Sequence, residues 1–381
     1  MDDADALWDE VTRRGTPLVD PVADGTDEVD LTYLWRATDP SVTAVEMVGT
    51  PSPVLNETFT RHPLTRLGET DTWTARFRAP ARTVHGYGYV ELGADRQPLN
   101  EAPRPDPHAR LQHPGPDARL DVPPLPGEWT PTFSVTDLRP EVGPVPPPAA
   151  SGTVREHAFT SELLGDTRRL WSYTPAGYDE GQPAWLVLLH DGWQWRASTP
   201  VATILDDLVA RGELPPTVVV LHECPEGRRG VELVGDERFA DALATELVPW
   251  ARETWGLPAD PARTVVAGQS YGGLNAAYLG LRHPNVFGHV VSQSGSYWHW
   301  REPSGEEWLT ALVRSSPRVP VRFHVEVGLL EGAMMVEANR RLREALAERG
   351  YEHAYRETAG DHGWIAWSRT LGDALRWVTH P

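Results

Sequence analysis

The sequence is poor in the residues that mark several common protein classes. It has 381 residues and a single cysteine, Cys224, which excludes an internal disulfide and a cysteine-based metal cluster. It contains no apolar run long enough to span a bilayer. Residues 1–5 are acidic and lack the basic and apolar regions of a signal peptide. We therefore expect a cytoplasmic protein that has no membrane partner.

Lysine is absent, so all 35 basic residues are arginines, and the formal net charge is −19. A surface this acidic repels nucleic acids and anionic membranes, so we expect no nucleic-acid partner. An anionic substrate would need a local arginine cluster to offset the overall field. The sequence also lacks a P-loop, a dinucleotide-binding glycine fingerprint and the His-x-x-x-His spacing of metalloproteases. We therefore expect neither a cofactor nor a bound metal.

The first third of the chain shows short runs of alternating polarity, separated by Pro, Gly, Asp and Asn. This pattern is typical of strands in a β-sandwich, and it predicts an immunoglobulin-like domain over residues 1–138. A segment rich in proline, alanine and glycine, residues 139–152, is predicted to be an extended linker. The predicted strands are 29–35, 42–48, 72–77 and 84–90.

Beyond the linker, residues 153–381 alternate between apolar runs and amphipathic helical segments. This alternation predicts a mainly parallel sheet with helices on both faces, which is an α/β domain. The predicted strands are 169–174, 184–190, 217–222, 263–268, 289–293 and 322–327. The predicted helices are 200–211, 238–255, 274–283, 306–314, 336–349 and 364–378.

Residues 268–272 read G-Q-S-Y-G and lie between an apolar strand-like run and a helical segment. A serine at a sharp turn from strand to helix is the nucleophile elbow of α/β-hydrolases. Glycines on either side allow the tight turn and the close approach of a substrate carbonyl. The sequence therefore predicts an α/β-hydrolase catalytic domain in which Ser270 is the nucleophile of an acyl transfer, most simply ester hydrolysis.

A serine nucleophile needs a general base, usually a histidine oriented by a carboxylate, and α/β-hydrolases place the acid before the histidine. His362 lies in a turn-rich loop before the last predicted helix, and we predict that it is the base. Glu331 is the first carboxylate after the strand 322–327, and we predict that it is the acid. Another carboxylate, or a Ser–His pair without an acid, remains an alternative, and His362 could instead be structural.

The tetrahedral intermediate also needs backbone N–H donors. One is expected from Tyr271, the residue after the nucleophile. The other is expected from the loop after the strand 184–190, where Trp193 is preferred and Gly192 is the alternative.

These motifs resemble the enterochelin (enterobactin) esterase family. The resemblance is carried by residues 265–274 around the elbow, by 287–298, and by 188–192, 229–233, 326–331 and 360–362. It implies a cytoplasmic serine hydrolase that cleaves the trilactone backbone of catecholate siderophores, often as ferric complexes, so that iron is released. By position, Ser270, His362 and Glu331 match the family's catalytic residues, and Arg229 matches an arginine near its site.

Substrate binding is expected from arginines and tryptophans in loops at the C-terminal edge of the sheet. Arg228 and Arg229 would offset an anionic siderophore, and Trp195, Trp298 and Trp300 would provide flat walls for catecholamide rings. Packing is the alternative role of these tryptophans. Two other functions remain open, a serine esterase or acyltransferase acting on another ester such as a carbohydrate ester, and a siderophore-binding protein with an inactive triad. The oligomeric state is not predicted.

Overall fold

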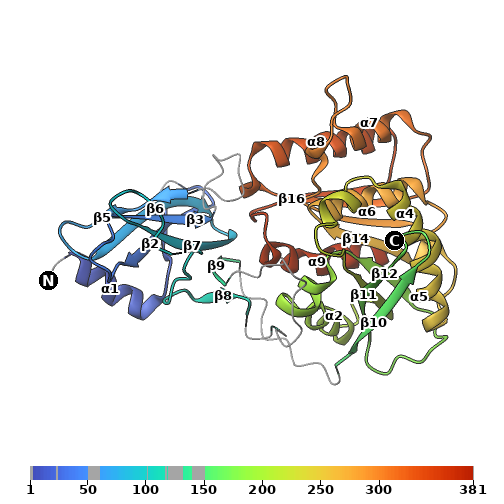
Figure 1. Cartoon of the computed structure of the whole chain (residues 1–381), viewed down its shortest axis with the longest axis horizontal. Helices are drawn as coiled ribbons and strands as arrows, with labels where there is room; N and C mark the ends of the chain where they lie inside the picture. Colours follow the sequence, from blue (N-terminus) through green and yellow to red (C-terminus); the bar gives the residue numbers. More distant parts are fainter. Residues whose placement is uncertain are drawn as a thin grey trace.

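A computed structural model describes residues 3–22, 25–49, 61–100, 102–115, 118, 132–139 and 151–380. The chain has two parts that lie side by side, an N-terminal β region and a larger α/β region (Figure 1). Most of the predicted linker, residues 140–150, lies outside the described residues. Within the described ranges, no helix combines the length and the apolar character needed to cross a membrane.

The N-terminal region contains helix α1 (Asp3–Arg14) and two antiparallel sheets. The four-stranded sheet has the order β1 (Leu18–Pro21), β2 (Glu28–Arg36), β6 (Thr72–Pro80) and β5 (Thr65–Arg66). The five-stranded sheet has the order β4 (Arg61–Pro63), β3 (Ala44–Gly49), β7 (Val84–Leu92), β9 (Phe133–Asp137) and β8 (Leu111–His113).

Alternate side chains of the two sheets form one core. Leu31, Tyr33 and Trp35 of β2 are buried in the same cluster as Tyr87 and Tyr89 of β7. The two-residue spacing is that of one strand face, which explains why alternating runs in the sequence predict these strands. The predicted strands of this region are confirmed, and the two sheets form a sandwich.

The α/β region is built on an eight-stranded sheet. Its order is β10 (Thr153–Ser161), β11 (Asp166–Thr174), β13 (Thr217–His222), β12 (Trp185–Leu189), β14 (Thr264–Gln269), β15 (His289–Gln293), β16 (Arg322–Gly328) and β17 (His353–Thr358). Strands β10 and β11 pair antiparallel, and the strands from β13 onward pair in parallel. The predicted α/β-hydrolase sheet is confirmed. Edge strand β10 was not predicted, because most of its side chains are polar and exposed.

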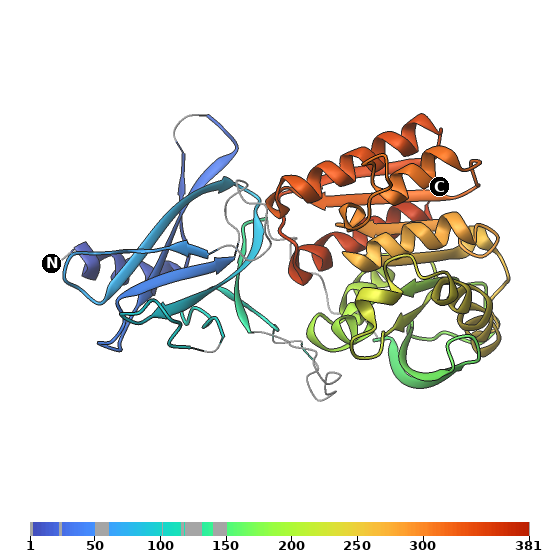
Figure 2. The ribbon, with the colours of Figure 1, turned by 45° about the horizontal axis from the view of Figure 1, so that its top comes forward.

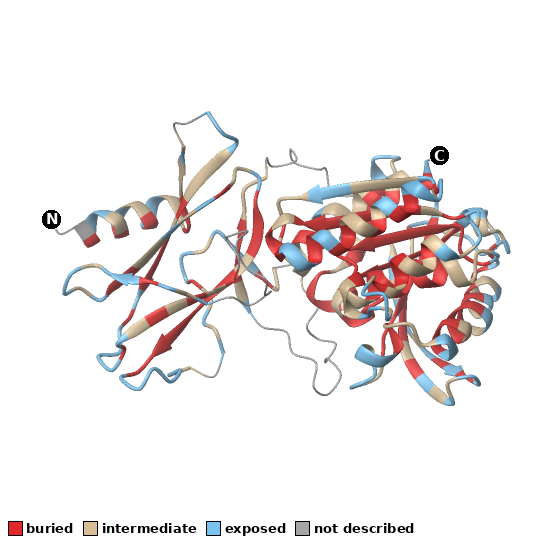
Figure 3. Cartoon of the chain, turned by 90° about the horizontal axis from the view of Figure 1, so that it is seen from above, coloured by how far each residue is buried: buried red, intermediate tan, exposed pale blue. Residues whose placement is uncertain are grey.

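Helices cover both faces of this sheet, so its central strands are buried (Figure 3). One buried cluster unites the sheet with α4 (Glu237–Ala242), α5 (Val248–Trp255), α6 (Tyr271–Arg282), α7 (Trp308–Ser315) and α8 (Ala333–Glu348). The other face packs against α2 (Val201–Ala210) and α9 (Trp364–Thr379). The predicted helix 238–255 is divided into α4, a π-helical turn η2 (Leu243–Leu247) and α5.

Candidate active site

Ser270 occupies a strained turn between β14 and α6. Its backbone angles are φ 58° and ψ −120°, which is a region that residues with a Cβ rarely adopt. A Cβ added to Gly268 would overlap the backbone of Gly272, so the turn requires a glycine there. The predicted strand–turn–helix context is thereby confirmed, and it places the serine at the C-terminal end of a central strand.

Glu331 and His362 are joined by a hydrogen bond, with 2.7 Å between Glu331 Oε2 and His362 Nδ1. Glu331 ends the turn η5 (Leu329–Glu331), and its side chain is buried. Its other oxygen, Oε1, accepts from the Ser294 hydroxyl at 2.5 Å and from the Gly328 amide at 2.6 Å. A carboxylate only accepts hydrogen bonds, so the His362 proton lies on Nδ1 and leaves Nε2 as the basic nitrogen.

Two other carboxyl groups near the site have different partners. Asp361 Oδ2 accepts from the Gly86 amide at 2.8 Å. Glu326, on β16, accepts from Gln293 Nε2 at 2.8 Å. Burial raises the pKa of each of these carboxyl groups to about 7. Unlike Asp361 and Glu326, Glu331 is bonded to the His362 ring, and this bond supports its predicted role as the acid.

Two serines that the sequence reasoning missed also lie at the site. Ser296 Oγ is 3.2 Å from Ser270 Oγ, and the Ser296 amide donates to the Ser270 carbonyl at 3.0 Å. Ser294 bonds Glu331 and accepts from the indole N–H of Trp367 at 2.8 Å. Both serines follow β15, the neighbour of β14, and that position at the same sheet edge is the signal that could have found them.

The two predicted oxyanion donors differ in their surroundings. Tyr271 is the first residue of α6, and the first amides of a helix have no intrahelical acceptor. The Trp193 amide donates to Glu223 Oε2 at 2.5 Å. A carboxylate oxygen therefore occupies the Trp193 donor, and it would have to move before this amide could bind an oxyanion. Both donor roles stay predictions.

The predicted arginines are bonded to carboxylates. Arg229 bonds both oxygens of Asp191, at 2.6 and 2.8 Å, and its guanidinium lies 5.7 Å from the centre of the Tyr271 ring. It therefore lies beside the residue that follows the nucleophile. Arg228 bonds Glu232 at 3.1 Å. These carboxylates offset much of the positive charge of the two arginines, so an anionic ligand would have to compete with the carboxylates for the guanidinium groups.

The predicted tryptophans differ in exposure. Trp195 is 0% exposed, and its indole N–H donates to Gln269 at 3.0 Å, so it supports the elbow from the interior and presents no surface to a ligand. Trp298 is partly buried against the core. Trp300 is 57% exposed, and its ring lies 6.1 Å from that of Trp308. Of the three, Trp300 has the most surface available for a ligand.

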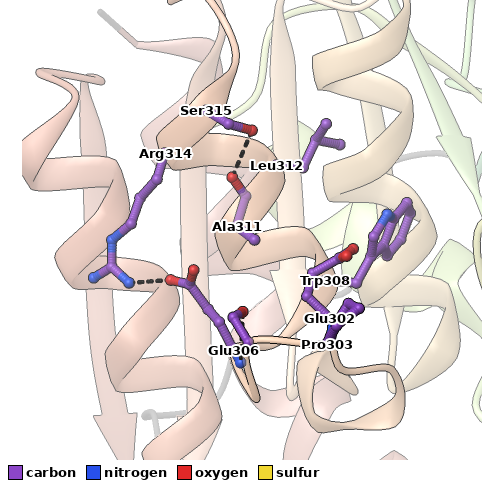
Figure 4. A pocket seen from close by; sticks show the side chains of 9 residues that line it. Glu302, Pro303, Glu306, Trp308, Ala311, Leu312, Arg314 and Ser315 are labelled. Atoms are coloured by element: carbon purple, nitrogen blue, oxygen red, sulfur yellow. Dashed lines mark hydrogen bonds and ion pairs between the residues drawn. The ribbon is translucent and has the colours of Figure 1, made fainter.

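A pocket of about 590 Å³ lies between the loop 302–306 and α7 (Figure 4). Its lining contains none of Ser270, Glu331 and His362. Arg314, at its rim, is turned toward Glu306 and bonded to it (Figure 4). This pocket is therefore separate from the predicted catalytic residues.

Residues 161–378 match the model of a family described as "Putative esterase". The chain is also 32% identical to the iron(III) enterobactin esterase of Dickeya dadantii, an alignment that covers 98% of this chain and 92% of that protein. The chain belongs to the enterobactin esterase family. It is a carboxylic-ester hydrolase, and the resemblance seen in its sequence motifs is confirmed.

Further relatives match along nearly their whole length. The iron(III) salmochelin esterase of Escherichia coli is 27% identical, over 97% of this chain and 92% of that protein. The crystal structure of a Shigella flexneri enterobactin esterase in the presence of enterobactin is 27% identical and has a TM-score of 0.75, with 96% of each chain covered. These alignments include the N-terminal β region, so both parts of the fold are shared with members of the family.

Proposed function

We propose that this esterase hydrolyses the trilactone backbone of a catecholate siderophore, presented as its ferric complex, so that the iron can be released. Relatives named for ferric enterobactin and ferric salmochelin align with nearly the whole chain. A solved relative was crystallised in the presence of enterobactin. We further propose the division into a sandwich domain (1–138), a linker (139–152) and a catalytic domain (153–381). The cytoplasmic location stays a prediction.

The proposed reaction begins when Ser270 Oγ attacks a lactone carbonyl carbon. The hydroxyl proton moves to Nε2 of His362, while Glu331 holds the proton on Nδ1 and stabilises the imidazolium. The amides of Tyr271 and Trp193 would bind the oxyanion, the latter once Glu223 has released it. His362 then gives its proton to the departing alkoxide, and the ring opens to leave an ester on Ser270. Water, deprotonated by His362, cleaves this ester and restores the serine.

The assignment of the catalytic roles rests mainly on the 2.7 Å hydrogen bond between the Glu331 carboxylate and His362 Nδ1. The carboxylate is held by two further donors, so it cannot rotate away from the ring without breaking their hydrogen bonds. An orienting group that is itself fixed keeps the imidazole in the reactive tautomer. This arrangement argues against a Ser–His pair without an acid, and against an inactive triad.

Electrostatics shape the expected binding of the substrate. A ferric tris-catecholate is an anion, whereas the chain carries a net charge of −19. Productive binding therefore needs local cations, and we propose Arg229 and Arg228 for this role. Exchange of the Asp191 carboxylate for catecholate oxygens would keep the Arg229 guanidinium paired throughout. Trp300, which is exposed, and Trp298 are proposed as aromatic contacts for the catecholamide rings.

The test is chromatographic analysis of the products from a ferric tri-catecholate trilactone with wild type, Ser270→Ala and the control Ser315→Ala. Ser315 lies on α7 and bonds the carbonyl of Ala311. We expect linear products from wild type and the control, and none from Ser270→Ala, although that variant still quenches tryptophan fluorescence on binding. Cleavage by Ser270→Ala would refute the serine mechanism. Wild type that cleaves simple esters but no trilactone would refute the substrate alone.

A further inference from the structure

The loop that carries His362 is bonded to the N-terminal β region. Val84, the first residue of β7, forms an isolated parallel bridge with Gly360. Its amide donates to the Ala359 carbonyl at 2.8 Å, and its carbonyl accepts from the Asp361 amide at 3.1 Å. Figure 2 shows the N-terminal strands reaching the red C-terminal elements. The start of β7 thus pairs with the catalytic-domain backbone immediately before the predicted base.

A side chain strengthens this backbone pairing. The Asp361 carboxylate accepts from the Gly86 amide at 2.8 Å, again across the two parts of the chain. Asp361 as a whole is partly exposed, but the burial of its carboxyl group raises the pKa of that group to about 7. Burying a carboxyl group costs free energy unless hydrogen bonds compensate. Its presence next to the predicted catalytic histidine therefore indicates that the side chain has a role there.

The opposite side of the same loop is bonded to the acid. The Gly360 carbonyl accepts from the Leu330 amide at 3.0 Å, and Leu330 directly precedes Glu331. The approach is close enough that a Cβ on Gly328 would overlap the Gly360 carbonyl oxygen. Gly360 is therefore held between β7 on one side and the turn that carries the acid on the other. Any shift of β7 would change the spacing between His362 and Glu331.

We propose that the N-terminal β region belongs to the catalytic apparatus, and that Asp361 is a positioning residue through which β7 fixes the loop of the catalytic histidine. This inference rests on the proposed role of His362. Two other contacts between the two parts lie outside that loop. Arg369 pairs with Asp137 at 3.2 Å, and the Ser198 hydroxyl lies 3.3 Å from His113. These two contacts hold the parts together without including a residue of the loop 359–362.

The test compares Asp361→Ala with Arg369→Ala in the full chain, using steady-state hydrolysis of a soluble ester. Misplacing a catalytic group by about 1 Å costs on the order of 100-fold, so we expect kcat of Asp361→Ala to fall about 10- to 100-fold while KM changes less than about twofold. Asp361→Asn keeps an acceptor for Gly86 and should recover most of kcat. Arg369→Ala loses a contact between the two parts away from the loop and should stay near wild type.

A spectroscopic readout separates positioning from general loosening. The proton shared by His362 and Glu331 should give a low-field NMR resonance in wild type and Arg369→Ala, which is broadened or lost in Asp361→Ala. Thermal unfolding shows whether each variant folds. Should Asp361→Ala fail to fold, Val84→Pro removes the donor to Ala359 at a position where strands tolerate proline, and the same loss of kcat is expected.

Three results would decide against the inference or its basis. Wild-type kcat in a folded Asp361→Ala variant overturns it, and so does an equal loss of kcat in Arg369→Ala, because the effect would then be a general loosening. His362→Ala is measured in parallel. Full activity in His362→Ala would overturn the proposed function itself, whereas an inactive His362→Ala beside a fully active Asp361→Ala overturns only the role of Asp361.

Discussion

Replacing Glu331 by glutamine tests the catalytic arrangement most directly, because the substitution keeps the shape and removes only the charge and one acceptor. In the structure, one carboxylate oxygen accepts from Ser294 and Gly328, and the other accepts from His362. A glutamine must keep its carbonyl oxygen toward the Gly328 amide, since the opposite orientation would set two N–H donors against each other. Its NH₂ group then faces His362 and favours the tautomer with the proton on Nε2.

That tautomer cannot take the serine proton. The corresponding change from carboxylate to amide in serine proteases lowers kcat by about 10⁴-fold, and we expect a loss of about 10³- to 10⁴-fold here. This corresponds to about 4 to 5.5 kcal/mol in the activation barrier. KM should change little, because Glu331 is buried and does not face the substrate.

The assay is steady-state hydrolysis of a soluble ester, with Glu326→Gln as the matched control. Glu326 is also a buried carboxyl group near the site, but its hydrogen bonds are to Gln293 and Thr370, whereas the His362 ring bonds Glu331. Glu326→Gln should therefore retain kcat within about threefold of wild type. A Glu331→Gln variant that keeps more than about a tenth of wild-type kcat would refute the reasoning and favour a Ser–His pair without an acid.

Two further predictions follow from burial and charge. Burial raises the pKa of Glu326 to about 7, so the folded protein binds this proton more tightly than the unfolded chain, and the contribution of Glu326 to stability is lost as pH rises from about 4 to 7. In urea unfolding, the free energy of unfolding of Glu326→Gln relative to that of wild type should increase across this pH window, by up to about 1.4 kcal/mol per pH unit. A stability difference that is independent of pH would contradict the prediction. Arg229→Gln should raise KM for a ferric tri-catecholate about tenfold but leave KM for a small neutral ester within about twofold. Equal changes for both substrates would argue that Arg229 acts through Asp191 and the backbone instead.

Much of the site could be predicted because the positions of its residues follow from local sequence patterns. The G-x-S-x-G turn needs its glycines for steric reasons, so Ser270 could be placed from five residues. The order of strands and helices placed Glu331 and His362 in loops at one edge of a parallel sheet, where such loops must meet. Alternating polarity likewise predicted the sandwich strands, whereas the polar edge strand β10 left no such signal.

By itself, the sequence determined the two-part architecture, the nucleophile, and candidates for the acid and the base, because each depends on periodicity or on a short motif. Only the tertiary structure decided which carboxylate meets the His362 ring, that Trp195 is buried, and that Glu223 occupies the Trp193 amide. The bond from Gly86 to Asp361 joins residues 275 positions apart. Such contacts depend on how separate elements pack, and packing sums weak interactions over the whole chain, so no local pattern encodes them.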